Sequence, residues 1–168
     1  MVFRVLDASA FYAGIPFSSP EKSYTTSTVF DEIKHIKKHH DAVNMLIDTH
    51  RLEIKDPEIK YTETALLKAK NVGDYHNLSK GDLSVIALCL QMQAELITDD
   101  FAVSNTAKQL GINVIPVMTK GITRVIEWIY FCPGCEKTFS KTLHCPLCGN
   151  KLSRKLGKSE PSTNPISK

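Results

Sequence analysis

Short apolar runs and amphipathic segments alternate along the first two thirds of this chain. The apolar runs have the length of buried strands, and the amphipathic segments carry apolar residues three or four positions apart, which is helical spacing. Strands that alternate with helices are typical of a parallel sheet flanked by helices, so the pattern predicts the α/β fold class. Strands are expected at residues 3–7, 52–54, 94–98, 112–115 and 125–131, and helices at residues 8–14, 29–38, 42–50, 61–71, 83–93 and 101–110.

Two segments interrupt this pattern. Residues 15–24 contain two prolines among small polar residues, and we expect them to form a loop. From Ser153 onward the chain consists mainly of Lys, Ser, Pro and Asn, which bury too little apolar surface to fold. We therefore expect a large domain at residues 1–120, a small one at 124–152 and a disordered tail at 153–168.

Two pairs of cysteines form the strongest local motif. A Cys-x2-Cys turn curls back so that both sulfurs point at one ion, and two such turns complete the tetrahedron of a structural zinc site. The nine residues between the pairs suit a short hairpin, so we predict one zinc ion in a zinc ribbon. A rubredoxin-like iron site and two disulfides are the alternatives. The predicted ligands are Cys132, Cys135, Cys145 and Cys148.

The composition is that of a soluble globular protein. The 168 residues are 42% hydrophobic and 23% charged, and no apolar run approaches the roughly 20 residues that cross a bilayer. The N-terminus lacks the basic and apolar layout of a signal peptide. We therefore expect a cytoplasmic protein, and a reducing compartment favours a metal over disulfides at the four cysteines. A monomer is also expected.

Charge is distributed unevenly along the chain. Residues 1–119 carry 12 Lys and Arg against 15 Asp and Glu, a net charge of −3, whereas residues 120–168 carry 9 against 3, a net charge of +6. A basic segment attracts the phosphates of a nucleic acid and releases their counterions. An acidic part joined to a basic, zinc-bearing part suggests an enzyme that acts on nucleic acid, and a solvated basic tail is the simpler alternative.

Acidic residues follow two of the predicted strands. Asp7 ends the first strand, and Asp99 and Asp100 end the strand at 94–98. Ligands bind outside the carboxyl ends of parallel strands, near the point where the strand order reverses, so these side chains are expected to face one cleft. Crowded carboxylates repel one another, and a bound Mg²⁺ or Mn²⁺ reverses that cost. Taken singly, each acid is more easily explained as a helix cap or a turn residue.

Four short motifs resemble the acidic motifs of the PIN-domain nucleases. The resemblance covers residues 2–118 and implies a PIN-like parallel sheet with a catalytic Mg²⁺ or Mn²⁺. The motifs are Val5-Leu-Asp-Ala-Ser-Ala-Phe11, Glu32, Gly81-Asp-Leu-Ser-Val-Ile-Ala-Leu88 and Leu96-Ile-Thr-Asp-Asp-Phe101.

The resemblance also implies roles for individual residues. The catalytic residues would be Asp7, Glu32, Asp82 and Asp100, with Asp7, Asp82 and Asp100 as the metal ligands. Asp99 is an extra acid beside the family's Thr-x-Asp pattern and is a possible ligand in place of Asp100. Ser9 and Thr98 are expected to fix carboxylate or phosphate oxygens by hydrogen bonding.

A PIN domain followed by a C-terminal zinc ribbon is similar to the Nob endonucleases, and the short chain with one ribbon resembles their archaeal form. This resemblance implies an endoribonuclease that cleaves precursor small-subunit rRNA, of the 16S type, in the pre-ribosomal small subunit to form its mature 3′ end. The ribbon would help to hold the RNA. The candidate phosphate contacts are Lys137, Lys141, Lys151, Arg154 and Lys155.

Two other functions fit the same residues. A toxin-type PIN ribonuclease that acts on other RNA shares the acids, but such chains usually lack a ribbon. A non-catalytic, RNA-binding ribosome assembly factor would use the ribbon without the acids. Cleavage of a model RNA that depends on Asp82 and on Mn²⁺ separates an enzyme from an assembly factor.

Overall fold

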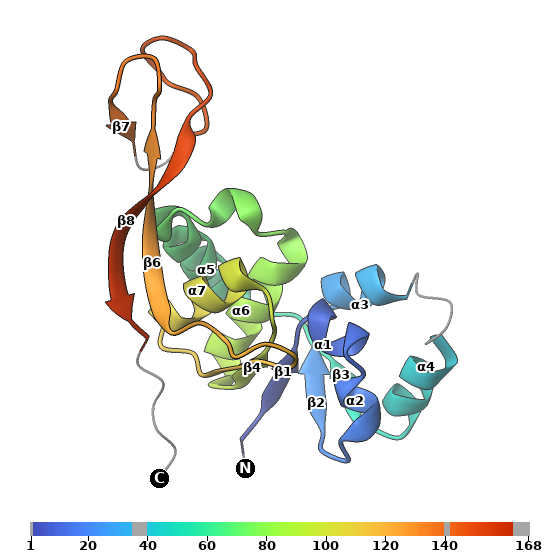
Figure 1. Ribbon diagram of the computed structural model, residues 1–168. Helices are drawn as coiled ribbons and strands as arrows, with labels where there is room; N and C mark the ends of the chain where they lie inside the picture. Colours follow the sequence, from blue (N-terminus) through green and yellow to red (C-terminus); the bar gives the residue numbers. More distant parts are fainter. Residues whose placement is uncertain (1, 35–39, 140–141, 163–168) are drawn as a thin grey trace.

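The N-terminal part of the chain forms one parallel sheet with the strand order β3-β2-β1-β4-β5. The computed structural model, which describes residues 2–34, 40–139 and 142–162, flanks this sheet with helices (Figure 1). The predicted α/β class, with a parallel sheet between helices, is confirmed. The strands are β1 (Arg4–Leu6), β2 (Ser23–Thr25), β3 (Leu52–Ile54), β4 (Glu95–Ile97) and β5 (Val114–Ile115).

Local capping signals set the ends of the main helices. Ser79 and Asp82 form a capping box at the start of α6, and Gly73 ends α5 in the left-handed conformation with a φ of 81°. None of the helices in the described part of the chain is long and apolar enough to cross a membrane. The helices are α1 (Ala8–Tyr12), α2 (Ile15–Ser18), α3 (Ser27–Ile33), α4 (His40–Asp48), α5 (Ile59–Val72), the 3₁₀ helix η1 (Tyr75–Asn77), α6 (Lys80–Met92) and α7 (Phe101–Gln109).

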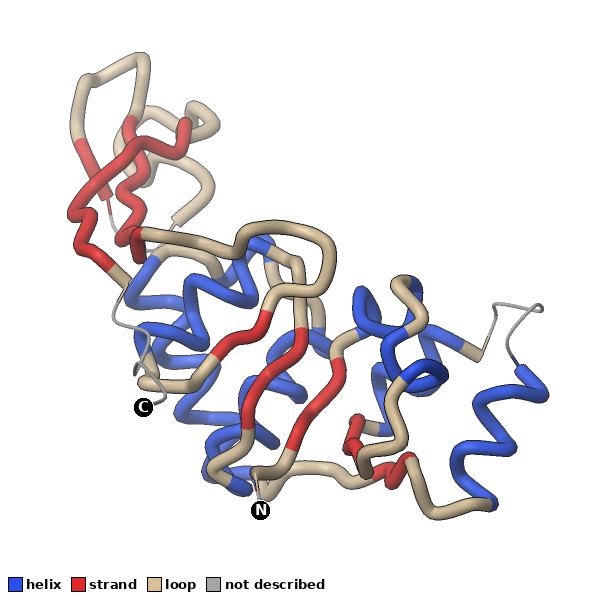
Figure 2. The backbone as a smooth tube through the Cα atoms, turned by 60° about the horizontal axis from the view of Figure 1, so that its bottom comes forward, coloured by secondary structure: helices blue, strands red, loops and turns tan. Residues whose placement is uncertain are grey.

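The strand order reverses between β1 and β4. The chain steps from β1 to β2 and β3 on one side, and from β4 to β5 on the other. β1 and β4 lie side by side with Leu6 opposite Ile97, so their carboxyl ends meet at one edge of the sheet. This is the position where open parallel sheets bind ligands. The loop that follows β5 arches over the same edge before it enters β6 (Figure 2).

Residues 15–24 were predicted to be a loop, and this prediction is wrong. They contain α2 and the first two residues of β2, the strand that pairs with β1 on one side. Its sequence, Ser-Tyr-Thr, lacks the apolar run of a buried strand, yet all three residues are buried. The Thr25 hydroxyl donates to the carbonyl of Leu6 at 3.0 Å, which removes the cost of burying it.

The C-terminal part forms a second, antiparallel sheet with the order β7-β6-β8. β6 (Arg124–Phe131) pairs with β7 (Thr138–Phe139) and with β8 (Ser153–Pro161). The prediction of disorder is therefore wrong for 153–161, while 163–168 lie outside the described residues. β8 is held by backbone pairing along β6, which composition does not reveal. Figure 1 shows β6 and β8 as an arm that carries the cysteine-bearing turns at its far end.

Two separate apolar cores correspond to these two sheets. The larger core joins the strands of the parallel sheet to the central helix α6, whose Val85, Ile86 and Leu88 are fully buried. The smaller core surrounds Cys132 and Cys145 with Tyr130 and Leu152. A core of four buried residues is too small to hold a fold by burial alone, so the small sheet needs another source of stability.

Candidate functional site

Asp7 lies at the centre of the carboxyl end of the parallel sheet. Its side chain is 3% exposed, and it caps the start of α1 through a 2.7 Å hydrogen bond from the backbone N–H of Ala8 to Oδ1. Oδ2 accepts from the Thr98 hydroxyl at 2.7 Å and from the Ser9 hydroxyl at 3.2 Å. The two hydroxyls named from the sequence therefore hold this carboxylate in one orientation.

The surroundings of Asp7 disfavour its negative charge. Burial raises the pKa of Asp7 above its usual value, the Thr98 hydrogen bond lowers it, and the nearby charge of Asp82 raises it again. Two carboxylates that repel each other at a buried edge are stabilised by a cation placed between them. The donor set, hard oxygens with hydroxyl support, fits Mg²⁺ or Mn²⁺.

Asp82 and Glu32 both lie at the start of α6. Asp82 accepts from the backbone N–H of Ser79 at 2.7 Å through Oδ2, which fixes its orientation in the capping box. A Cβ atom at Gly81 would lie in ordinary contact, 3.6 Å from Oε2 of Glu32, so the carboxylate of Glu32 on α3 lies close to the helix start. The neighbouring Asp31 instead points to solvent and pairs with Lys34 at 2.7 Å. Glu32 rather than Asp31 therefore lies beside Asp82.

Asp99 and Asp100 have different partners. The carboxylate of Asp99 accepts from the backbone N–H groups of Val117, Met118 and Thr119 at 2.9, 2.8 and 3.2 Å, and from the Thr119 hydroxyl at 2.9 Å. These bonds hold its pKa below the usual range in spite of partial burial, which acts in the opposite direction. Asp99 therefore serves as the anchor of the loop that follows β5.

Asp100 is linked to Thr98 through its backbone and caps α7 through its side chain. Its backbone N–H donates to the Thr98 hydroxyl at 3.1 Å, and Oδ1 accepts from the N–H of Val103 at 2.9 Å as the cap of α7. In the described part of the chain no group donates to its Oδ2. One carboxylate oxygen of Asp100 is thus free for a ligand, while both oxygens of Asp99 are engaged.

The acids form a looser group than the cysteines. Among the described residues, only the four cysteines bring three or more potential ligand atoms within 4.8 Å of one another. Mg²⁺ binds through one or two carboxylates, substrate phosphate and several waters, so it does not need a closed protein cage. An open group of this kind leaves coordination positions for a substrate.

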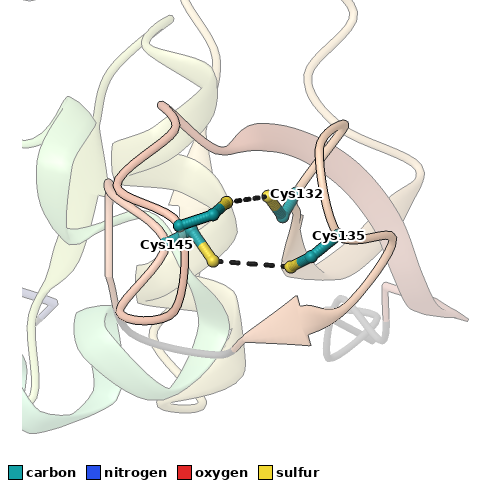
Figure 3. A group of neighbouring side chains, drawn as sticks. Cys132, Cys135 and Cys145 are labelled. Atoms are coloured by element: carbon teal, nitrogen blue, oxygen red, sulfur yellow. Dashed lines mark hydrogen bonds between the residues drawn. The ribbon is translucent and has the colours of Figure 1, made fainter.

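The cysteine site is closed. Sγ of Cys132 lies 3.4 Å from that of Cys148, and Sγ of Cys135 lies 3.5 Å from that of Cys145. All four thiols are free, and these separations exceed the roughly 2.05 Å of a disulfide, which excludes that alternative. Figure 3 shows Cys132, Cys135 and Cys145 converging from two turns. A tetrahedron of thiolates about 2.3 Å from a zinc ion requires similar sulfur separations.

Backbone N–H groups around these sulfurs favour thiolates. Burial raises the pKa of Cys145, but the N–H groups of Cys148 and Leu147 outweigh it and lower the pKa to about 6. The N–H of Asn150 lowers the pKa of Cys148, yet the sulfurs of Cys132 and Cys145 raise it to about 11. Crowded thiolates therefore repel one another, and a dication removes that repulsion. The donor set fits zinc.

The basic residues singled out from the sequence fall into three groups. Lys137, Lys151 and Lys155 are exposed on the ribbon, and Lys141 lies outside the described residues. Arg154 is different, because its Nη1 lies 3.4 Å from Oδ1 of the buried Asp74. This partner could not be predicted from the sequence, since an aspartate directly after a helix-ending glycine is normally a surface residue.

Several known proteins are similar to this chain in sequence. A family model described as the PIN domain of ribonuclease matches residues 4–92. Endoribonuclease Nob1 of Methanocaldococcus jannaschii is 35% identical over 163 residues, which covers 95% of this chain and 80% of that protein. Endoribonuclease Nob1 of Pyrococcus abyssi is 32% identical over 151 residues, which covers 88% of this chain and 90% of that protein.

A ribonuclease with a different name is also similar. Ribonuclease VapC1 of Thermoplasma acidophilum is 34% identical over 133 residues, which covers 79% of this chain and 67% of that protein. The similarity to the two Nob1 proteins extends over nearly the whole chain, including the parallel sheet and the cysteine site. The family model covers more than half of the chain, and the two Nob1 proteins are similar to it over most of its length. The chain therefore belongs to the Nob1 family of PIN-domain endoribonucleases.

Proposed function

We propose that this protein is a metal-dependent endoribonuclease that cleaves precursor small-subunit rRNA to form its mature 3′ end. Two links at the edge where β1 and β4 meet support this most strongly: the charge of Asp82 acts on Asp7, and the Thr98 hydroxyl binds both the Asp7 carboxylate and the backbone N–H of Asp100. We place the activity in the cytoplasm and in a monomer, with the nuclease domain at residues 1–120 and the ribbon, which includes β8, at residues 124–161.

The acids would hold Mg²⁺ or Mn²⁺ in the open site. Asp7, Asp82 and Asp100 are the proposed ligands, and Glu32 lies beside them. When bound, the ion supplies a more acidic water and neutralises charge on the phosphate under attack. Thr98 and Ser9 orient Asp7, so the carboxylate needs little rearrangement on binding.

Helix caps leave the other acids partly free. The backbone N–H of Ser79 donates to Oδ2 of Asp82, and the backbone N–H of Val103 donates to Oδ1 of Asp100. The second oxygen of each carboxylate is then available to the ion. A group that is both capped and half free is held in position without being neutralised, which is what a catalytic ligand requires.

The ribbon would bind the RNA. Cys132, Cys135, Cys145 and Cys148 would hold one structural Zn²⁺, and iron is the alternative ion for such a site. Lys137, Lys151 and Lys155 would contact phosphates, together with Lys141. These contacts depend on charge rather than on sequence, so binding is expected to weaken with salt.

Asp82→Asn tests the enzymatic proposal. The asparagine keeps an oxygen that accepts from Ser79, so the helix cap survives while the charge is lost. With an RNA that spans a small-subunit rRNA 3′ end and with Mn²⁺, we expect cutting to fall by roughly 10²–10³-fold, since a metal contributes several kcal/mol. EDTA should abolish cutting by the wild type. Asp31→Asn, which removes an exposed charge next to Glu32, is the matched control.

The outcomes separate the candidate functions. Equal cutting by the wild type and Asp82→Asn would remove the enzymatic assignment. RNA binding with no cutting by either would favour an assembly factor. Cutting that depends on Asp82 but falls elsewhere in the RNA would retain the nuclease and favour the broader ribonuclease activity suggested by the name of the VapC1 relative.

A further inference from the structure

A buried asparagine ties the strand pair β6–β8 to the nuclease core. Asn105 on α7 is 0% exposed. Its Oδ1 accepts from the N–H of Ile126 at 2.7 Å, and its Nδ2 donates to the carbonyl of Ile126 at 2.7 Å. The side chain thus pairs with β6 as a neighbouring strand would. Gln109, one turn further along α7, donates to the same carbonyl at 3.1 Å.

An ion pair between a buried aspartate and a partly exposed arginine extends this contact to β8. Oδ2 of Asp74 accepts from Nδ2 of Asn105 at 2.5 Å, and Oδ1 lies 3.4 Å from Nη1 of Arg154. Asp74 is completely buried, whereas the Arg154 side chain is 34% exposed and lies 4.2 Å from the centre of the Trp128 ring. A buried carboxylate is costly without a partner, so Asp74 favours the position of β8 in which Arg154 reaches it.

The backbones approach closely around this pair. A Cβ atom at Gly73 would lie 2.8 Å from both Cβ and the carbonyl oxygen of Trp128, so only glycine allows β6 to lie against the end of α5. The Tyr130 hydroxyl donates to the carbonyl of Gly73 at 2.8 Å. Polar and steric contacts together leave little freedom for β6 to rotate or slide on the core.

The contact is continuous with both functional parts of the molecule. Cys132 follows Tyr130 by two residues along the same chain segment, and Arg154 and Lys155 are neighbours on β8. On the other side, Asp74 precedes η1 and the capping box of Asp82. Asp74 also lies close enough to Asp100 to feel its charge. The strands β6 and β8 therefore form a fixed arm between the ribbon and the edge of the parallel sheet where the acids lie.

We propose that Asp74 and Arg154 are positioning residues that determine which phosphodiester is cut. They fix the distance and direction between the lysines of the ribbon, which hold one part of the RNA, and the acids, which receive another part. The substrate class that this selects is an RNA whose ribbon-bound segment lies at a set distance from the scissile phosphate. This inference rests on the proposed function.

Two variants test it from the two sides of the pair. Asp74→Asn can still accept from Asn105, but its amide N–H groups then face Arg154 and repel it. Arg154→Met keeps an apolar stem against Trp128 and removes the charge. Lys158→Met, on the same strand, makes the same change of charge without a contact to Asp74 and is the matched control. Since a misplacement of about 1 Å can cost 10²-fold, we expect cutting at the main position to fall by roughly 10- to 100-fold in both test variants.

The readout is the distribution of product ends in a long RNA, measured beside cutting of a short RNA that does not reach the ribbon. Both test variants should spread the product ends of the long RNA and leave cutting of the short RNA unchanged. Trp128 is the only tryptophan of the chain, so its quenching by acrylamide should rise in the same variants and report the loosened arm.

The product ends of the variants support or overturn the positioning role of Asp74 and Arg154. Sharp, unchanged product ends from folded Asp74→Asn or Arg154→Met would overturn the inference, and so would equal spreading in Lys158→Met. If Asp74→Asn does not fold, Arg154→Met, which changes a partly exposed residue, carries the test alone. If the proposed nuclease function is wrong, the wild-type protein will cut neither the long nor the short RNA, and this result differs from every outcome that tests the positioning role.

Discussion

The cysteine site and the acid site present two ways of assembling ligands. The four cysteines come from two tight turns within a short stretch, and their sulfurs already lie close together. The acids lie far apart in the sequence: Asp7 follows β1, Asp100 precedes α7, and the pairing of β1 with β4 brings these two to the same edge of the sheet. The first arrangement is local and closed, whereas the second is long-range and open. A closed site suits a structural ion, and an open one suits an ion that must also bind substrate.

The two sites also differ in what supports them. The acids stand on a large core, so the parallel sheet does not need a metal in order to fold. The small sheet has a core of four residues, two of which are cysteines. Loss of zinc should therefore unfold the ribbon, whereas loss of Mg²⁺ or Mn²⁺ from the acids should abolish cutting and leave the parallel sheet folded.

Cys145→Ser should produce the largest effect on structure. Structural zinc contributes roughly 10–16 kcal/mol to the folding of small zinc modules, so the ribbon should lose its fold while the parallel sheet stays intact. Native mass spectrometry should show one Zn²⁺ on the wild type and none held tightly by the variant, and NMR should place the loss of structure in residues 132–152. Cys89→Ala, which changes a buried thiol outside the site, is the control and should keep its zinc. A ribbon that remains folded in Cys145→Ser would show that the ribbon does not depend on its ion for folding.

Asp100→Asn and Asp99→Asn should separate catalysis from loop anchoring. Asp100→Asn is expected to lower the cutting rate by about 10²-fold or more at nearly unchanged stability, since metal stabilisation is worth several kcal/mol. Asp99→Asn should keep most of the cutting and lose about 1–3 kcal/mol of unfolding free energy, because it weakens hydrogen bonds to a charged acceptor. Cutting assays and urea unfolding measure the two effects. The opposite assignment of effects would make Asp99 the ligand.

The pH dependence of stability should reveal Asp74, with a smaller effect. Burial is the main cause that raises the pKa of Asp74 to about 6, and the Asp100 charge adds to it, while Asn105 and Arg154 act in the opposite direction. The folded protein therefore binds this proton more tightly than the unfolded chain, so the unfolding free energy should fall by about 1 kcal/mol as the pH rises from about 5 to about 7.5. Urea unfolding at both pH values should show this component in the wild type and not in Asp74→Asn. Equal pH slopes would contradict it.

The cysteine site could be predicted from the sequence more fully than the acid site, for physical reasons. The spacing of the cysteines was enough to predict a common centre, because two tight turns determine where four sulfurs point. Alternating patterns predicted the helices other than α2 and η1, and most strands. The pattern failed at β2, whose polar side chains are buried through hydrogen bonds, and at β8, whose backbone pairs with β6 although its side chains are mostly exposed.

The residue types and their spacing alone determined the α/β class, the presence of two pairs of thiols facing one centre, and the acids available for a metal. Tertiary structure decided which of the adjacent acids is free, since Asp99 and Asp100 differ only in the groups that reach them from the loop after β5 and from α7. It also decided how the ribbon arm is held, because the contact of Asp74 with Arg154 joins residues 80 positions apart. Local patterns record short-range preferences, whereas burial and pairing between distant segments exist only once the chain has folded.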